Sequence, residues 1–389
     1  MCDPVRKKEK FLIFGSPEIG EEEIGEVVST LRSGWIGTGP KVAAFEEMFR
    51  VYCGSDHAIA LNSCTAALHL SLLALKLEPG SEVITTPLTF CATINAIIHA
   101  GLVPVLADVD YSTMNIDPEQ IEAKITPKTR AIIPVHFAGR PCQMDLIMEL
   151  AEKHNLYVVE DCAHAVESRY KGKKTGTFGR FGCFSFYVTK NMTTGEGGMV
   201  LAQKGEDAAW IKMLALHGMS ADAWKRFGDE GYKHYYVVES GFKYNMMDIQ
   251  ASIGIHQMNR LEKNWKRRKE IWDQYNNAFS EIEVIVPEKP AKDTRHGYHL
   301  YTILIDRDKC GVCRDEFIKR MTYHNIGVGV HYLSLPEHPF YQRQFGWNPQ
   351  DYPNASIIGR QTISLPLSAK LTDRDVLDVI KGVKYSIGA

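Results

Sequence analysis

The stretch VITTPLTFCATINAIIHAGLVPVLADV, residues 83–109, is the most apolar part of the chain. Pro87, Gly101 and Pro104 interrupt it, and His99 adds a polar group. A membrane-spanning helix needs about 20 consecutive apolar residues. The interruptions therefore favour a strand, a helix and a second strand in a buried core over a membrane span.

The same alternation of strand-like and helical runs extends from about residue 58 to residue 205. Helical patterns such as TAALHLSLLALKL and MDLIMELAEKH separate most of the strand-like runs, although only a loop separates the last two. Helices of this length between strands imply crossover connections and a mostly parallel sheet that is covered on both faces. We therefore expect an α/β fold with a seven-stranded sheet, formed by AIAL, EVITT, VPVLADV, RAIIPVH, LYVVED, CFSFY and GMVLAQ.

A long amphipathic stretch at about 246–279 follows the sheet-forming part of the chain. Its apolar residues have helical spacing, and we interpret the basic residues near its middle as a solvated face. Beyond it, the strand signals YHLYTILI and GVGVHY mix with helical patterns, which is typical of a small α+β domain. We expect a large α/β domain over residues 15–260 and a small C-terminal α+β domain over 261–389, linked by the long helix.

The composition excludes several classes of protein. The chain has 389 residues, of which 44% are hydrophobic and 24% are charged, as in ordinary globular proteins. Its formal net charge of −2 gives no general field that would attract nucleic acid or an anionic membrane. The N-terminal segment MCDPVRKKEKFLIF has no long apolar stretch behind it, so we expect no secretory signal, no membrane anchor and a cytoplasmic location.

The cysteines do not indicate a disulfide framework or a metal site. There are nine, an odd number scattered through a large chain, which favours reduced thiols. The CxxC from Cys310 to Cys313 has no second pair at the spacing that a zinc site needs. We interpret both as structural cysteines and expect no metal.

Polar side chains follow the strand-like runs where those runs end, which is where ligands bind in open α/β sheets. Asp161 closes the run LYVVED, and its carboxylate is either a helix cap or the partner of a positively charged group. The segment LNSCTAALHL, residues 61–70, ends a strand and begins a helix, and helix N-termini favour anions. Ser63 and Thr65 are therefore either ordinary helix caps or part of an anion site.

Three more residues occupy strand ends. Phe90 follows one strand and either belongs to the core or lies against a flat ligand. The stretch FSFYVTKNMTTGEGGMV, residues 184–200, places Lys190 between a strand-like run and a glycine-rich turn. Ser185 in the same stretch could add a hydroxyl to the anion site, although its alternation within CFSFY also permits a buried, hydrogen-bonded serine.

The combination is more informative than its members. One sheet would carry an anion site, an aromatic face, a carboxylate and an amine on successive strand ends. Pyridoxal 5'-phosphate (PLP) has a phosphate, a flat ring, a ring nitrogen that must stay protonated and a reactive aldehyde. The sequence therefore predicts a PLP site in which Lys190 reacts with the aldehyde and Asp161 pairs with the ring nitrogen.

Several segments together resemble the DegT/StrS family of sugar aminotransferases, in the same order and over nearly the whole chain. They are NSCTAALHL, ITPKTRAIIPVHFAG, VVEDCAHAVESRYKGKKTG, FSFYVTKNMTTGEGGM and GFKYNMMDIQASIG. The resemblance implies the PLP-dependent aspartate aminotransferase type of fold and a homodimer with active sites at the subunit interface. LRSGWIGTGPKVAAFE, LHGMSADAW and RDKCGVCRDEF look most like the branch with UDP-4-amino-4-deoxy-L-arabinose and spore-coat polysaccharide enzymes.

By position in this resemblance, Lys190 matches the Schiff-base lysine and Asp161 the partner of the pyridinium nitrogen. His164 falls where this branch often has a histidine next to the ring oxygen of the cofactor. His331 and Tyr332, in GVGVHY, lie where family members approach the sugar nucleotide, although this match is looser.

The same resemblance assigns the contacts to the phosphate. Thr65, Ala66 and Ser185 match phosphate-binding positions, and Asn245 matches an asparagine that reaches the phosphate of the neighbouring subunit. Cys64 departs from the family pattern, because glycine is common there. Its backbone N–H can still bind phosphate if the local geometry does not need a positive φ angle.

The resemblance implies transamination of a nucleotide-linked ketosugar, with L-glutamate as the donor and 2-oxoglutarate as the keto acid released. A 4-keto sugar and a role in cell-surface polysaccharide, lipopolysaccharide or spore-coat biosynthesis are expected. Two alternatives stay open. Relatives that dehydrate sugars replace the lysine with histidine, whereas Lys190 is present here, and a non-catalytic PLP-binding regulator would lack a chemical group or carry a DNA-binding module.

The identity of the acceptor sugar depends on loops whose shape the sequence does not define. Two such loops span residues 217–240 and 331–345. No arginine stands out as the clamp for the carboxylate of the amino donor. The sequence therefore predicts the reaction more closely than the substrate.

Overall fold

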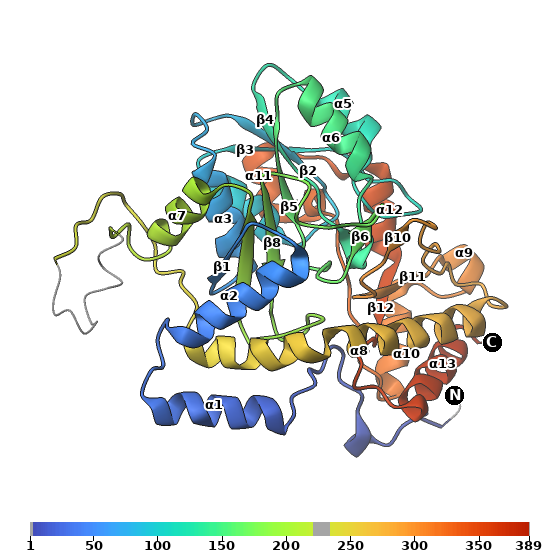
Figure 1. Ribbon diagram of the computed structural model, residues 1–389. Coiled ribbons are helices and arrows are strands. Elements are labelled where there is room, and N and C mark those ends of the chain that lie inside the picture. Colours follow the sequence, from blue (N-terminus) through green and yellow to red (C-terminus); the bar gives the residue numbers. More distant parts are fainter. Residues whose placement is uncertain (1–2, 221–233, 389) are drawn as a thin grey trace.

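The computed structural model describes residues 3–220 and 234–388, so most of the loop predicted at 217–240 lies outside the described residues. A seven-stranded sheet with the order β1-β9-β8-β5-β4-β2-β3 forms the centre of the large part of the molecule (Figure 1). The β2–β3, β2–β4, β4–β5 and β5–β8 pairs are parallel, and β9 is antiparallel to both of its neighbours. The predicted seven-stranded, mostly parallel sheet is confirmed. Its strands are His57–Leu61 (β1), Glu82–Thr85 (β2), Val103–Leu106 (β3), Thr129–Ile133 (β4), Tyr157–Asp161 (β5), Phe181–Ser185 (β8) and Gly198–Ala202 (β9).

The apolar stretch at 83–109 forms the expected strand, helix and strand. Helix α4, Cys91–His99, connects β2 to β3. The two strands are parallel neighbours, with Val83 opposite Pro104. Gly101 has a φ of 75° and ends the helix, because its N–H and that of the next residue bond back to helix carbonyl groups. Pro104 is tolerated because β3 is an edge strand of the sheet.

The strands alternate their side chains between two apolar layers. Ile59, Val83 and Val200 belong to one cluster of buried side chains, which includes residues of α3 (Cys64–Ala74), α4 and α7 (Gly205–Leu214). Ile84 and Leu201 point to the other face. That face is covered by α2 (Pro40–Cys53), α5 (Pro118–Lys124), α6 (Met144–Lys153) and the start of α8 (Asp248–Phe279). Helices on both faces explain why the strands are apolar throughout.

The predicted long helix is α8, Asp248–Phe279, which runs from the sheet to the C-terminal part of the chain (Figure 1). Its second half packs in a separate apolar cluster with the antiparallel pair of β11 (Tyr301–Leu304) and β12 (Thr362–Leu365). The same cluster contains α10 (Arg314–Tyr323) and α13 (Asp373–Ile387). This is the small α+β part of the predicted fold, while the boundary between residues 260 and 261 stays a prediction.

One expectation about the C-terminal part is wrong, and another is correct only in part. Residues 327–332, GVGVHY, do not form a strand, because only Gly329 among them pairs with β12, through two hydrogen bonds with Ser364. Between His331 and Tyr332 the peptide bond is cis. The basic middle of α8 is not a fully solvated face, because Arg268 is only 2% exposed and pairs with the buried Glu167.

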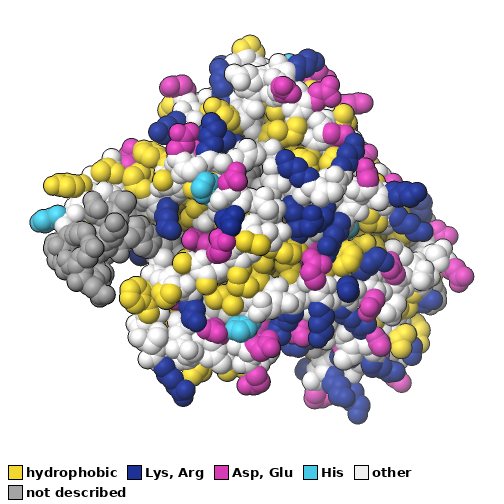
Figure 2. All heavy atoms as spheres, in the orientation of Figure 1, with side chains coloured by type: hydrophobic (Ala, Val, Ile, Leu, Met, Phe, Trp, Pro, Cys, Tyr) yellow, Lys and Arg dark blue, Asp and Glu magenta, His cyan; other side chains and the backbone are white. Residues whose placement is uncertain are grey.

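None of the helices in the described ranges is both long and apolar enough to cross a membrane. On the face shown in Figure 2, basic and acidic side chains are interspersed, as the small net charge predicts. The remaining elements are short or peripheral. They are η1 (Lys8–Lys10), α1 (Glu21–Ser33), η2 (Phe137–Gly139), β6 (Arg169–Tyr170), β7 (Lys173–Lys174), β10 (Thr294–Arg295), α9 (Arg307–Cys310), η4 (Leu335–Glu337), α11 (Pro339–Phe345), η5 (Pro349–Asp351) and α12 (Pro353–Gln361).

Candidate active site

A cavity of about 520 Å³ lies at the carboxyl ends of β1, β2, β5 and β8, where the sequence predicted the site. Side chains from the C-terminal part of the chain complete its wall. The cavity brings together all the predicted site residues except Ala66 and Asn245. Those that line it are Ser63, Thr65, Phe90, Asp161, His164, Ser185, Lys190, His331 and Tyr332.

Asp161 is the last residue of β5 and is 4% exposed. Its Oδ2 accepts a hydrogen bond of 2.9 Å from the Thr93 hydroxyl, and its Oδ1 accepts one of 3.1 Å from the Ala163 N–H. Burial raises the pKa of Asp161, whereas these two bonds and the nearby Lys190 amine lower it. A positive group in the cavity would favour the ionised carboxylate further.

Lys190 lies five residues beyond the end of β8, and its backbone N–H donates to the Tyr187 carbonyl at 2.9 Å. Burial lowers the pKa of the Lys190 amine to about 8, against the opposing influence of Cys64 and Asp161. Removal from water disfavours the charged form of an amine. The amine therefore reaches its neutral, nucleophilic form at a lower pH than an exposed lysine does.

The N-terminus of α3 faces the cavity. Ser63 is the helix cap, because its Oγ accepts the Ala66 N–H at 3.1 Å, so the ordinary cap interpretation of Ser63 is correct. The N–H groups of Cys64 and Thr65 belong to the first turn, which has no acceptors within the helix. Cys64 is not among the residues with positive φ, so a side chain at this position does not strain the turn.

The glycine-rich turn after Lys190 lets β9 approach this helix end. A Cβ atom on Gly198 would lie 2.4 Å from the backbone carbon of Ser63 and 2.6 Å from the nitrogen of Cys64. No side chain fits at such distances, and relief would require the backbone to move. Glycine at position 198 therefore sets the position of the anion-binding turn.

Two histidines and a tyrosine form one side of the cavity. Nδ1 of His164 accepts the Ala138 N–H at 3.2 Å, which leaves Nε2, 3.2 Å from the Tyr332 hydroxyl, as the protonated nitrogen. Burial lowers the pKa of His164 well below its ordinary value and lowers that of His331 to about 4. Both rings are therefore neutral at pH 7.

The remaining predicted residues differ in their placement. Phe90 is 58% exposed and lines the cavity, so it does not belong to the core. Ser185 is buried, lines the cavity and accepts a long bond of 3.4 Å from the Tyr187 N–H. Ala66 is buried, and its N–H is taken by the helix cap. Asn245 lies outside the cavity lining, donates to Thr38 at 2.6 Å and has a buried Oδ1 without a partner in the described structure.

A network of hydrogen bonds that was not predicted from the sequence holds the residue that follows Lys190. Asn191, the next residue, donates to Oε2 of Glu167 at 2.8 Å, and the other Glu167 oxygen accepts from Arg268 of α8. Oδ1 of Asn191 lies 3.0 Å from Nδ1 of His299, whose ring centre is 4.4 Å from that of His164. Only the position of Asn191 beside Lys190 could have signalled this network, because its partners are distant in the sequence.

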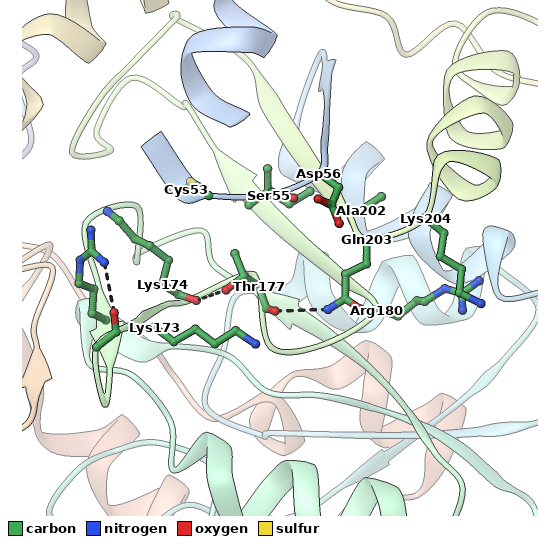
Figure 3. Close-up of a pocket in the computed structure, with 15 residues that line it drawn as sticks. Cys53, Ser55, Asp56, Lys173, Lys174, Thr177, Arg180, Ala202, Gln203 and Lys204 are labelled. Atoms are coloured by element: carbon green, nitrogen blue, oxygen red, sulfur yellow. Dashed lines mark hydrogen bonds between the residues drawn. The ribbon is translucent and has the colours of Figure 1, made fainter. Parts of the chain in front are cut away.

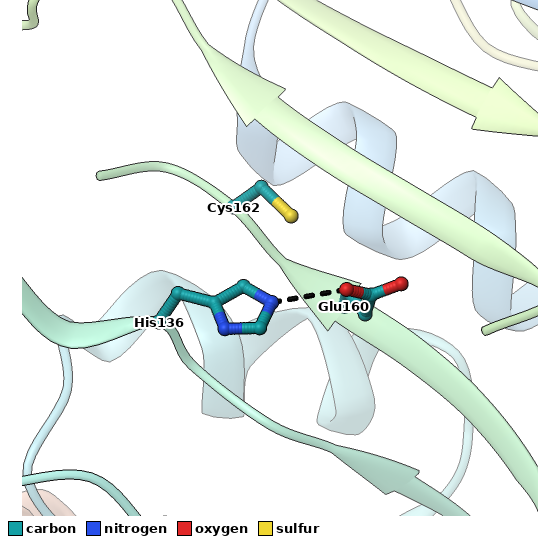
Figure 4. Close-up of side chains that lie close together, drawn as sticks. All are labelled: His136, Glu160 and Cys162. Atoms are coloured by element: carbon teal, nitrogen blue, oxygen red, sulfur yellow. Dashed lines mark hydrogen bonds and ion pairs between the residues drawn. The ribbon is translucent and has the colours of Figure 1, made fainter. Parts of the chain in front are cut away.

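His136, Glu160 and Cys162 lie close together and are fully buried, as metal ligands often are (Figure 4). The two carboxylate oxygens of Glu160 accept from His136 Nε2 at 3.0 Å and from the N–H groups of Gly176, Phe178 and Gly179 at 2.7–2.8 Å. Nδ1 of His136 accepts the Cys142 N–H. Every nitrogen and oxygen of the cluster is thus already hydrogen-bonded, which indicates a structural role.

The cavity presents an amine, a buried carboxylate, an exposed aromatic ring and a helix N-terminus within one wall of strand ends. These groups fit the aldehyde, ring nitrogen, ring face and phosphate of PLP. Together with the doubly covered sheet, they define a PLP-dependent enzyme with the aspartate aminotransferase type of fold.

The sequence model of the DegT/DnrJ/EryC1/StrS aminotransferase family matches residues 17–384, and the chain belongs to this family. It is 48% identical over 381 residues to the spore coat polysaccharide biosynthesis protein SpsC of Bacillus subtilis, with 98% of both chains covered.

Two solved structures extend the comparison. The putative sugar aminotransferase Spr1654 from Streptococcus pneumoniae, in its PLP form, has a TM-score of 0.90 at 33% identity, with 97% of this chain and 98% of that chain covered. DesI, solved in the presence of its TDP-sugar product, has a TM-score of 0.87 at 27% identity, with 99% and 94% covered. The predicted family, fold, cofactor and enzyme class, a PLP-dependent sugar aminotransferase, are confirmed.

Proposed function

We propose that this protein transfers the amino group of L-glutamate to a 4-keto sugar carried on a nucleotide, for the synthesis of a cell-surface polysaccharide, lipopolysaccharide or spore coat. The observation that carries the proposal is the placement of the Lys190 amine and the Asp161 carboxylate in one cavity that α3 closes with its N-terminus. An amine, a carboxylate and an anion site in this relation fit PLP chemistry.

PLP supplies an aldehyde that binds amines covalently and a ring that accepts negative charge from the carbon next to the bound nitrogen. Lys190 would hold bound PLP through the aldehyde. Because burial lowers the pKa of the Lys190 amine to about 8, the released amine can take the proton from the donor carbon and return it to another atom.

Asp161 would face the ring nitrogen of bound PLP and would keep that nitrogen protonated. The carboxylate is fixed by Thr93 and by the Ala163 N–H, so it does not need to reorganise when charge develops in the ring. His164 carries its proton on Nε2 and can donate a hydrogen bond to the ring oxygen, because Nδ1 is occupied by the Ala138 N–H.

The phosphate would be held by the first turn of α3, with Thr65 and Ser185 as side-chain donors. Both side chains line the cavity. The backbone N–H groups of Cys64 and Thr65 and the positive end of the helix dipole favour an anion at this position. Ser63 contributes by fixing the turn through its bond to Ala66.

The sugar acceptor is supported by the relatives. SpsC is named for spore coat polysaccharide biosynthesis, and DesI was solved with a TDP-sugar product. In this chain His331 and Tyr332 form the side of the cavity that the C-terminal part provides, and we assign them to the sugar. The assignment of glutamate as the donor and of C4 as the aminated carbon follows from the family resemblance.

We further propose a homodimer in which Asn245 completes the phosphate site of the partner. Two points support it: Asn245 lies outside the cavity of its own chain, and the family resemblance matches it to an asparagine that reaches the phosphate of the neighbouring subunit. A two-fold interface would present the same residue to both sites. The cytoplasmic location stays a prediction from the sequence.

The test is a screen of the purified holoenzyme with L-glutamate against UDP-, GDP- and dTDP-linked ketosugars. We expect formation of 2-oxoglutarate and an aminosugar nucleotide. The kinetics should be ping-pong, because the keto acid would leave before the ketosugar binds. Initial-rate lines that converge when both substrates are varied would contradict the mechanism. Loss of water from the sugar without gain of nitrogen would instead identify a dehydratase.

A further inference from the structure

A second cavity, of about 580 Å³, lies at the end of the central sheet opposite to Lys190. Figure 3 shows the residues that line it. It is formed by the hairpin of β6 and β7, the loop that enters β8, the end of β9 and the turn that precedes β1. Residues 53–56 of its lining come before β1 and Arg180 comes before β8, whereas residues of the first cavity follow these two strands. The second cavity is therefore separate from the active site.

The lining of this cavity is strongly cationic. Five of the lining residues are basic and one is acidic, Asp56; the basic residues are Arg169, Lys173, Lys174, Arg180 and Lys204. Arg180 is neutralised by Asp207, with bonds of 2.5 and 2.9 Å to the two carboxylate oxygens. Lys204 lies 3.9 Å from Glu206. The other three basic residues form no ion pair with a carboxylate in the described part of the chain.

Lys174 is the least hydrated of these cations. It is 3% exposed, and its Nζ lies 3.6 Å from the centre of the Tyr52 ring and 3.4 Å from the Val166 carbonyl. Burial lowers the pKa of Lys174 to about 8. A buried ammonium without a carboxylate partner is costly, and an anion nearby would offset that cost.

The walls of the cavity are fixed by buried hydrogen bonds. Glu160 holds the backbone of the loop at 176–179, and the Gln203 amide donates to the carbonyl of Gly179 at 2.8 Å. The Thr177 hydroxyl donates to the Lys174 carbonyl at 2.7 Å. The backbone of the loop that follows Lys174 is therefore fixed before a ligand binds, which lowers the entropy that this loop would lose on binding.

The chemistry of the lining limits the ligand. The volume is within the range of small-molecule sites, about 300–1,000 Å³. No aromatic residue is in the lining, so a nucleobase would find no ring to stack on. Arginine and lysine together suit phosphate groups, which carry more charge than a carboxylate. We propose that this cavity binds a compact phosphate-bearing anion, such as pyrophosphate or a sugar phosphate, through Arg169, Lys173 and Lys174.

The site is tested by isothermal titration calorimetry of the PLP-loaded protein with inorganic pyrophosphate at low ionic strength. We expect one site per chain in the wild type. The double variant Arg169→Ala/Lys173→Ala should bind pyrophosphate about tenfold more weakly or worse, because two charge-assisted contacts are lost. Circular dichroism checks that the variant is folded.

Lys171→Ala is the matched control. Lys171 is in the same hairpin but lies outside the cavity lining, and its Nζ is 2.6 Å from Asp145. This variant should bind pyrophosphate as tightly as the wild type. Absence of binding in the wild type would overturn the proposal. Equal binding by the folded double variant would also overturn it, because the anion would then be bound elsewhere, including at the active site.

Discussion

Lys190 shows how burial prepares a side chain for chemistry. An exposed lysine is almost fully charged at neutral pH, whereas burial lowers the pKa of the Lys190 amine to about 8. The neighbouring Cys64 does not compete as a nucleophile, because burial raises the pKa of its thiol well above the ordinary value and keeps it protonated. The amine is therefore the nucleophile of this cavity.

The rate at which PLP attaches to the cofactor-free protein should rise with pH and level off above about 8, because only the neutral Lys190 amine reacts. The measurement is the growth of visible absorbance after mixing with PLP between pH 6 and pH 10. Lys190→Ala should show no such growth. A profile that is flat across this range would mean that the amine is not the group that titrates.

Asp161→Asn should lower kcat by about two to three orders of magnitude, because a neutral amide cannot hold the proton on the ring nitrogen. Thr93→Val should have a smaller effect, about tenfold, because it removes one hydrogen bond to the carboxylate and leaves the charge. Steady-state kinetics and the absorption maximum of the bound cofactor check both. Equal effects of the two variants would contradict the assigned roles.

Single residues were predictable from the sequence where the fold makes strand ends converge. Lys190, Asp161 and Phe90 all follow β-rich runs, and parallel strands bring such positions to one edge. Arg268 was not predictable, since its burial depends on Glu167, which is distant in the sequence. From the local sequence pattern alone, Arg268 was predicted to lie on a solvated face of the helix.

At the scale of elements, Glu160 ties β5 to the loop that enters β8. Glu160→Gln should destabilise the protein by about 3 kcal/mol, because an amide nitrogen would face backbone N–H donors in a buried place. Denaturant unfolding measures the change. Glu152→Gln, at an exposed site of α6, should change stability by less than about 0.5 kcal/mol.

Chelation of metal tests whether the cluster of His136, Glu160 and Cys162 is structural or binds a metal ion. If His136, Glu160 and Cys162 are structural, treatment with EDTA should leave the unfolding midpoint of the wild type unchanged. A lower midpoint that zinc restores would instead identify a metal site.

Helix α8 is joined to the active site by the buried pair of Arg268 and Glu167. Glu167→Gln should destabilise the protein by about 3 kcal/mol, because it leaves a buried guanidinium without a counter-charge. Glu262→Gln, which breaks a half-exposed pair with Arg295, should cost about 1 kcal/mol or less. Denaturant unfolding measures the free energy of unfolding of both variants. Equal decreases would show that the buried pair does not stabilise the protein more than the half-exposed pair.

The strands of the central sheet were predictable because each is a continuous apolar run between turn residues. The run GVGVHY has a similar pattern but is not a strand, since only its Gly329 pairs with β12. Whether a run finds a free sheet edge is a property of the tertiary structure. The local sequence pattern therefore cannot predict which runs pair with a sheet edge.

At the scale of the whole molecule, the proposed shared sites make a prediction about mixed dimers. Lys190→Ala and Asn245→Ala chains should each have little activity alone. A dimer with one chain of each kind would contain one intact site, so a random mixture should recover about a quarter of wild-type activity. Co-expression without selection of the mixed species measures this value, and the mixed dimer purified through two different tags should have about half of wild-type activity. Activity no higher than that of the parents would show that each chain has a self-contained site.

The order of strands has a consequence for synthesis on the ribosome. β1 is made first among the strands, yet in the described sheet its neighbour is β9, which is made last. In the nascent chain, β1 therefore stays unpaired with β9 until residue 202 has emerged from the exit tunnel. Because the anion-binding turn of α3 directly follows β1 and rests against Gly198, vitamin B6 can be loaded only after translation of the whole large sheet.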